Sequence, residues 1–234
     1  VQTSTDTTWG LCFHASGKFS SAALRQAFLQ ALDREALESL LPAGSIPAED
    51  PLPPDTRFAG ASYRDAAGGS FYMRESDGAA ALYQSQNLGE FSVTLLCTEE
   101  NKALASQMLA NWNETFETYF SLEAVDEETL RARVEAGSFD VALYPLSAET
   151  ADAGTALSHF LSGQNTNPTG ISDPQFDSLL SGASTPAELA QAEKRLCDAA
   201  VFYHAFAAAP GISGGWMHGF CGGMDFLHAQ KDGG

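Results

Sequence analysis

Hydrophobic residues recur along the chain at two different spacings, which together predict strands and helices. A short apolar run at residues 11–13 is typical of a buried strand. Ser21 is suited to cap the helix that the next segment predicts. Over residues 22–41 the apolar positions recur at steps of three and four, which predicts one helix with a buried face made of Leu24, Ala27, Phe28, Ala31, Leu32, Leu37, Leu40 and Leu41.

The middle of the chain alternates between the two spacings most clearly. Residues 91–96, 115–125 and 139–144 are typical of strands. Between the first two we expect a helix that Thr98 caps and that runs to about Trp112.

A second helix is expected between the last two of these strands, from the capping residue Asp126 to Gly137. This gives a βαβαβ segment at about residues 91–145, and a helix between two strands requires a crossover. The three strands should therefore be largely parallel. The pattern predicts an α/β fold with a mixed, largely parallel sheet flanked by helices.

The remaining segments are predicted with fewer signals. Five prolines at residues 42–54 favour an extended segment along the surface, and residues 77–84 favour a short helix. Residues 145–183 are rich in loop-forming residues and have few periodic apolar positions.

The end of the chain combines one strong helix signal with a glycine-rich tail. Thr185, Pro186 and Glu188 form a capping box with proline at the first helical position, so a helix is expected at about 186–203. The tail at 211–234 is predicted to be mostly loop, with a final strand near Met224.

Length and charge narrow the class of protein. A chain of 234 residues can form a single large domain with a sizeable core. The formal net charge of −18 disfavours binding to nucleic acid, because both partners would be negative. No apolar run approaches the roughly 18 residues that a membrane-spanning helix needs.

The four cysteines do not form a recognisable metal or redox motif. Cys12, Cys97, Cys197 and Cys221 are widely and irregularly spaced. Cys12 and Cys97 lie in apolar, strand-like runs, which favours buried thiols, although two disulfides would be allowed outside the cell.

Several segments in a fixed order resemble one family of transport proteins. Residues 24–35, preceded by 9–14 and followed by 52–54, carry the first part of the pattern. It continues through residues 137–144, 165–170 and 173–180 and the helix at 186–203. In this order they resemble the family-5 extracellular solute-binding proteins of bacterial peptide transporters.

The resemblance implies a fold and a function. Members of that family have two lobes that close on the ligand, and the match covers only the second. The chain would then be one lobe of periplasmic-binding-protein type II, spanning residues 1–234. It would capture oligopeptides for an ABC importer without catalysis or cofactor. Its partners would be the peptide, the permease subunits and a first lobe absent from this chain, and the whole protein would be extracytoplasmic and lipid-anchored.

The resemblance also implies candidate ligand-binding residues. Aligned from Phe139, Leu146 falls where the family has a tryptophan, and Glu149 falls where it has an aspartate that pairs with the ligand's amino terminus. An acid suits that role because a buried ammonium needs a charge-assisted partner. The other candidates are His14, Tyr144, Ser147 and Trp216. For Glu149 an exposed loop acid, and for the others ordinary packing or a contact between lobes, are the alternative interpretations.

Two arginines of the first helix match the family as well. For Arg25 and Arg34 we favour a structural role, in which each anchors a neighbouring loop or pairs with an acid such as Asp33 or Glu38.

Two other classes of function remain as alternatives. Residues 211–215 fit the G-x-S-x-G pattern of a serine hydrolase, with Ser213, Asp225 and His228 in the order of a catalytic triad. Proline and glycines flank the serine instead of a buried strand and a helix, so a loop is the preferred interpretation. A sensory or regulatory domain with the same lobe fold is the third hypothesis. His218, Cys221 and His228 have no specific metal-ligand spacing, and no metal is expected.

Overall fold

Six strands form one mixed sheet. The computed structural model describes residues 7–41, 45–48, 50–53, 56–68, 78–147, 152–200 and 202–208. The strand order is β2-β8-β1-β7-β5-β6. The strands are β1 (Thr7–Phe13), β2 (Ile46–Pro47), β5 (Thr94–Thr98), β6 (Ser121–Val125), β7 (Val141–Ser147) and β8 (Phe202–Ala208).

The pairing of the strands divides the sheet at β7. Strand β5 is parallel to both β6 and β7, so the predicted βαβαβ segment is confirmed. Strand β1 is antiparallel to β7 on one side and to β8 on the other, and β2 adds antiparallel to β8. The predicted mixed α/β fold is therefore confirmed. A separate small hairpin joins β3 (Arg57–Phe58) and β4 (Ala61–Ser62).

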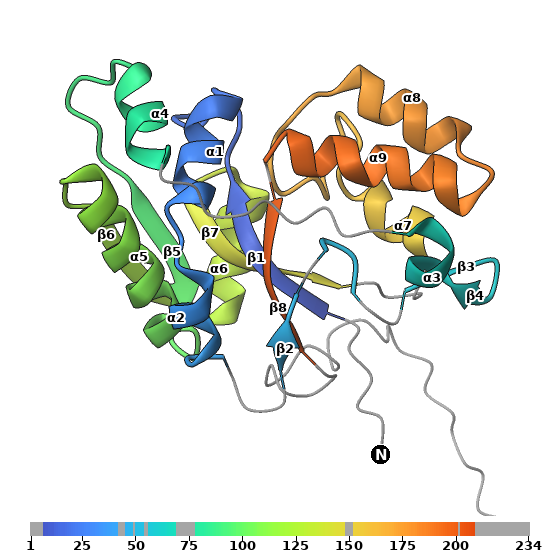
Figure 1. Ribbon diagram of the computed structural model, residues 1–234, viewed down its shortest axis with the longest axis horizontal. Coiled ribbons are helices and arrows are strands. Elements are labelled where there is room, and N and C mark those ends of the chain that lie inside the picture. The colour runs from blue at the N-terminus through green and yellow to red at the C-terminus, as the bar shows by residue number, and fades with distance from the viewer. Residues whose placement is uncertain are drawn as a thin grey trace, which may run out of the picture.

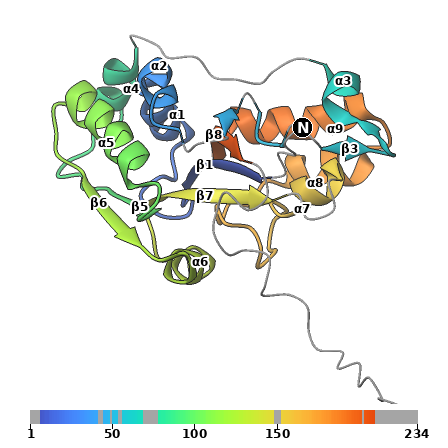
Figure 2. The same cartoon turned by 90° about the horizontal axis from the view of Figure 1, so that it is seen from below.

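Helices cover both faces of the sheet (Figures 1 and 2). One face is covered by α1 (Ala22–Gln30), α2 (Arg34–Glu38), α4 (Ala79–Ser85) and α5 (Lys102–Phe116). The other is covered by α3 (Tyr63–Ala67), α6 (Glu127–Glu135), α7 (Ala153–Ser158), α8 (Pro174–Gly182) and α9 (Pro186–Asp198). We call the first the aromatic face and the second the ionic face, after the side chains described below.

The aromatic face is organised around Phe28. Its ring centroid lies 4.9 Å from that of Phe19 and 5.0 Å from those of Trp112 and Phe116. The indole N–H of Trp112 also donates to the Phe28 carbonyl over 2.7 Å, so the polar group of this buried ring is satisfied. Further rings within 6.5 Å of Phe28 are those of Phe13, Tyr83, Phe91 and Phe120.

The ionic face contains a buried network of charges. Glu193 on α9 has no exposed surface, and its carboxylate accepts from the Tyr63 hydroxyl at 2.8 Å and from Arg64 at 2.7 Å. Arg64 also pairs with Asp50 over 3.2 Å. Although these partners oppose it, burial raises the pKa of Glu193 above its ordinary value. The network fastens α3 and the proline-rich segment onto α9.

The first predicted helix is divided in two, so the prediction of one helix at 22–41 was wrong. Ser21 caps α1 as predicted, since its hydroxyl accepts from the Leu24 N–H. Asp33 then caps α2 by accepting from the Ala36 N–H over 3.0 Å. This cap satisfies backbone donors at a new helix start, and the apolar spacing continues across the break.

The boundaries around the central strands also differ from the prediction. Thr98 ends β5 and caps no helix, and α5 runs on to Phe116, so the first residues of the predicted strand 115–125 are helical. Glu117, at φ +52°, ends the helix in the left-handed conformation. The predicted bounds of the second helix hold, because Asp126 caps α6 and Gly137 follows its end at φ +63°. The strands predicted at 91–96 and 139–144 run instead over 94–98 and 141–147.

The last third of the described chain holds the largest corrections. The capping box of α9 is present as predicted, but the helix ends at Asp198, and 202–208 form β8 instead of extending it to 203. Two helices, α7 and α8, lie within 145–183, where loop was predicted. Each is short and begins at an aspartate cap, Asp152 or Asp173, a signal that a search for long periodic segments misses.

Two arginines connect separate parts of the structure. The buried guanidinium of Arg25 donates to the carbonyls of Phe19, Ser20 and Ala199, which joins α1 to the end of α9. Arg34 donates to the Ala48 carbonyl in the proline-rich segment. The prediction that these arginines anchor loops is confirmed.

The cysteines of the described chain are free. Cys12 and Cys97 are buried, as predicted, and burial raises the pKa of Cys97 to about 11, so the thiol stays protonated near neutral pH. Among the described residues, none of the helices combines the length and the apolar character that crossing a membrane requires.

Candidate functional site

Three strand ends meet at one edge of the sheet. Ser147, the last residue of β7, pairs with Thr7, and Thr7 pairs with Ala208 at the end of β8. The carboxyl ends of β7 and β8 therefore lie beside the amino end of β1. In open α/β sheets, ligands bind outside the carboxyl ends of strands where the strand connections change direction. We use the name β7 edge for this end of the sheet, where β7 and β8 end and β1 begins, and it is the candidate site.

Tyr144 lies at the middle of β7, three residues before Ser147, and keeps its proton at neutral pH. It packs half-buried against the ionic-face cluster, and burial raises the pKa of its phenol to about 12, with the Glu135 carboxylate adding to the effect. Its cross-strand partner is Gly10, which has no side chain. The protonated phenol can donate a hydrogen bond.

Leu146, which the resemblance places at the family's tryptophan, is buried at the β7 edge. It lies two residues after Tyr144 on β7, on the same face of the strand, and belongs to the same hydrophobic cluster. Its side chain therefore serves the core, and it cannot supply the aromatic wall that a tryptophan would. Ser147 lies at the edge itself, as the last residue of the strand.

His14 lies at the opposite edge of the sheet. It follows Phe13, which pairs with Val141 at the start of β7, and the backbone N–H of His14 donates to the Asp140 carbonyl. The seven residues of β1 separate it from the β7 edge by roughly 20 Å. The structure therefore places Ser147 at the β7 edge, Tyr144 at the middle of β7 and His14 at the opposite edge.

The other predicted residues lie outside the described residues. These are the ligand-binding candidates Glu149 and Trp216, and the hydrolase candidates Ser213, Asp225 and His228. Glu149 follows the end of β7 by two positions in the sequence. In the described part of the chain, no group of three or more histidine, cysteine or acidic side chains is arranged to hold a metal ion.

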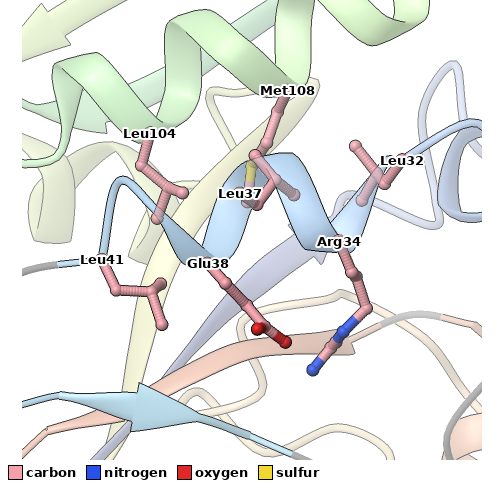
Figure 3. A pocket seen from close by; sticks show the side chains of 7 residues that line it. All are labelled: Leu32, Arg34, Leu37, Glu38, Leu41, Leu104 and Met108. Carbon is pink, nitrogen blue, oxygen red and sulfur yellow. The ribbon is translucent and has the colours of Figure 1, made fainter.

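A small pocket between α2 and α5 is too narrow for a ligand (Figure 3). Leu37 on α2 meets Leu104 and Met108 on α5, while Arg34 and Glu38 point away from α5. The cavity measures about 10 Å³, which is room for one water molecule at most. We assign it to helix packing.

Comparison with known proteins gives a likeness of fold. No family model and no curated protein matches the sequence. Among solved structures, Listeria monocytogenes OppA bound to peptide is similar, with 19% identity and a TM-score of 0.76 over 88% of this chain and 44% of that one. The Escherichia coli murein tripeptide binding protein MppA matches with 19% identity and a TM-score of 0.75, over 88% of this chain and 43% of that one.

This chain has the fold of a lobe of a type II periplasmic binding protein. It spans less than half the length of OppA and MppA. A third structure, a peptide-binding protein of a peptide ABC transporter, matches with 20% identity and a TM-score of 0.75 over 87% of this chain and 99% of its own length. A solved chain of nearly the same extent as this lobe therefore exists.

The sequence missed one feature of the lobe that could bear on function. Lys18 and Asp140, far apart in the chain, form an ion pair of 2.9 Å beside His14. Asp140 also accepts from the Thr94 N–H over 3.1 Å. The only sequence signal for this ion pair is the position of Asp140 immediately before a strand, which does not identify its partners.

Proposed function

We propose that this chain is the substrate-binding lobe of an extracytoplasmic solute-binding protein that captures oligopeptides for an ABC importer. The likeness of its fold to OppA, MppA and a third peptide-binding protein is the observation that carries the proposal. The lobe acts with a second lobe, and the two close on the peptide by a hinge motion. Delivery to the permease and attachment to the membrane by a lipid belong to the full-length protein.

The β7 edge supplies the chemistry that a peptide needs. In our proposal Tyr144, three residues before Ser147 on β7, offers the peptide a protonated phenol with apolar surface. In our proposal the carboxylate of Glu149 pairs with the ammonium group of the peptide, because that cation needs an anionic partner once it leaves water. Leu146 in place of an aromatic wall leaves the first peptide side chain less tightly enclosed.

Titration calorimetry with trialanine tests the two-lobe proposal. The two-lobed protein should bind the peptide, and this lobe alone should bind it at least about 100-fold more weakly, because half of the enclosing surface is absent. Equal, tight binding by the lobe alone would contradict the need for a second lobe.

A blocked peptide tests the role of Glu149. In the two-lobed protein, Glu149→Gln should weaken trialanine binding by about 30-fold or more, since it leaves the ammonium unpaired. Glu90→Gln, which removes a charge from an exposed loop, is the matched control and should leave affinity unchanged. N-acetyl-trialanine should bind weakly and equally to wild type and Glu149→Gln; a further loss on this peptide would show a structural role instead.

Two further experiments test the neighbouring predictions. Tyr144→Phe should weaken trialanine binding severalfold, and Tyr119→Phe, at a side chain that is 93% exposed, should not.

A fluorophosphonate probe should leave the protein unlabelled. Covalent labelling of Ser213 would instead support the serine-hydrolase hypothesis.

A further inference from the structure

A second pocket lies at the edge of the sheet opposite the β7 edge. It is an open cavity of about 370 Å³, where β1 ends and β5 and β7 begin. Leu96 and Phe139 form its apolar part. Its polar lining includes His14, Lys18, Thr94, Arg133, Ser138 and Asp140, and we call it the His14 pocket.

The charge of this pocket differs from that of the whole chain. The protein carries 30 acidic residues and 12 basic ones, yet the pocket is lined by two basic side chains, Lys18 and Arg133, and by a single acid, Asp140. That acid is already neutralised, because Asp140 accepts from both Lys18 and the Thr94 N–H. Arg133 is in turn paired with Glu123, so the charges around the pocket balance, in contrast to the negative charge of the whole chain. An anion entering the pocket therefore meets hydrogen-bond donors without a local excess of negative charge.

Both basic side chains are held in place and retain unused donors. Lys18 donates to the Ser92 carbonyl at 2.8 Å and to Asp140 at 2.9 Å, which leaves the third N–H of its ammonium group. Arg133 donates through Nε to the Ser138 carbonyl and pairs through Nη1 with Glu123. Within the described residues, its Nη2 has no protein partner, so the anchored guanidinium can bind an oxyanion without first being ordered.

The imidazole of His14 is fixed as well. Its Nε2 lies 2.9 Å from the Ser16 hydroxyl, and its ring packs on Phe139 at 5.2 Å. When Ser16 donates to Nε2, the ring proton is on Nδ1, which has no protein partner in the described part of the chain. Gly17 has no side chain, which leaves Nδ1 accessible. Any other residue at position 17 would place a Cβ 3.1 Å from Nδ1.

We propose that the His14 pocket binds a small ligand through an oxyanion group, a phosphate or a carboxylate, held between Lys18 and Arg133 with His14 Nδ1 as a third donor. Charge-assisted hydrogen bonds from lysine and arginine are well suited to such groups. The cavity has room for the oxyanion and for a small organic part against Phe139. Because this site lies across the sheet from the β7 edge, it is independent of peptide capture.

Calorimetric titration of the chain with sodium phosphate and with sodium acetate, at constant ionic strength and pH 7, tests the proposal. We expect saturable binding of at least one anion. The anion that binds with the higher affinity shows whether the pocket prefers a phosphate or a carboxylate. Arg133→Gln and Lys18→Gln should each weaken that binding roughly tenfold, because each removes a charged donor.

Two control variants distinguish a specific binding site from attraction by the net charge of the protein. Lys194→Gln removes a lysine that is likewise paired with an aspartate, on the far helix α9, and should change affinity by less than about twofold. Gly17→Ala keeps both charges but covers Nδ1, and should weaken binding roughly threefold. Thermal unfolding confirms that each variant is folded.

Two results would overturn the proposal. The first is the absence of saturable binding of either anion to the wild-type chain. The second is an equal loss in Lys194→Gln, which would show that net charge alone attracts the anion.

Discussion

The two faces of the sheet are stabilised by different kinds of side chain. The aromatic face packs rings around Phe28, which alone lies within 6.5 Å of seven other aromatic rings. The ionic face packs mainly leucine, alanine and phenylalanine side chains and encloses the Tyr63–Glu193–Arg64–Asp50 network. Dispersion and burial stabilise the first without requiring exact charges. The second depends on every polar partner being present.

This difference predicts how each face responds to substitution. On the aromatic face, the cost follows the volume removed, and neighbouring rings can relax into part of the space. On the ionic face, the cost follows what is left unpaired, so a substitution that removes little volume can still be costly.

The largest expected effect is on the aromatic face. Phe28→Ala should lower the free energy of unfolding by about 3–5 kcal/mol, because it opens a cavity at the centre of the cluster. Urea unfolding followed by tryptophan fluorescence measures it. Tyr119→Ala removes an aromatic ring that is 93% exposed and should change stability by less than about 0.5 kcal/mol. Equal effects of the two would show that the cluster around Phe28 is not the core.

On the ionic face, Glu193→Ala should cost about 3 kcal/mol, since it leaves the buried Arg64 and Tyr63 groups without their acceptor. Urea unfolding again measures the change. Glu193→Ala combined with Arg64→Met and Asp50→Asn should recover part of the loss, because all three charges of the network are then gone. If this triple variant is less stable than Glu193→Ala alone, the network is not coupled as the structure indicates.

The smallest of the three effects is at the joint between α8 and α9. Asp173 caps α8 through the Gln175 and Phe176 N–H groups and pairs with Arg195 on α9 over 2.8 Å. Burial raises the pKa of Asp173, but Arg195 and these N–H groups outweigh it and hold the pKa below its ordinary value. Its stabilisation is therefore present above about pH 4 and is lost as the pH falls through the lowered pKa.

Asp173→Asn should accordingly cost about 1 kcal/mol at pH 7 and almost nothing near pH 2. Urea unfolding between pH 2 and 7 measures the difference. Asp198→Asn, which breaks the more exposed pair with Lys194, is the matched control and should show less than half of that change. A cost for Asp173→Asn that does not vary with pH would rule out the ionised pair as its source.

The same contrast explains what could be predicted from the sequence. The aromatic face follows local rules: Leu24, Phe28 and their helical spacing identify a buried face, and Ser21 marks its start. The βαβαβ order also follows from local signals, since Asp126 and Gly137 bound a helix between two apolar runs. These parts of the fold were therefore predicted.

The parts that were missed depend on contacts between residues distant in the sequence. Strand β8 follows a short turn in which Ala200 adopts φ +53°, and only its pairing with β1 distinguishes it from a continuation of α9. Likewise, Glu193 lies in the apolar stripe of α9, and only Tyr63 and Arg64, from α3, explain why a charge is tolerated there. In the candidate site, the sequence placed Tyr144 on a strand, while its cross-strand partner Gly10 and the pocket at His14 required the fold.

The central position of β1 has a consequence for biosynthesis. Its partners across the sheet are Pro145 for Trp9 and Ala208 for Thr7, so both neighbours of this apolar strand are translated long after it. Pairing over such separations is slow, because the chain entropy of closing a long loop must be overcome first. Until residue 208 leaves the ribosome, β1 has an unpaired apolar edge that chaperones can recognise and that other nascent chains can join.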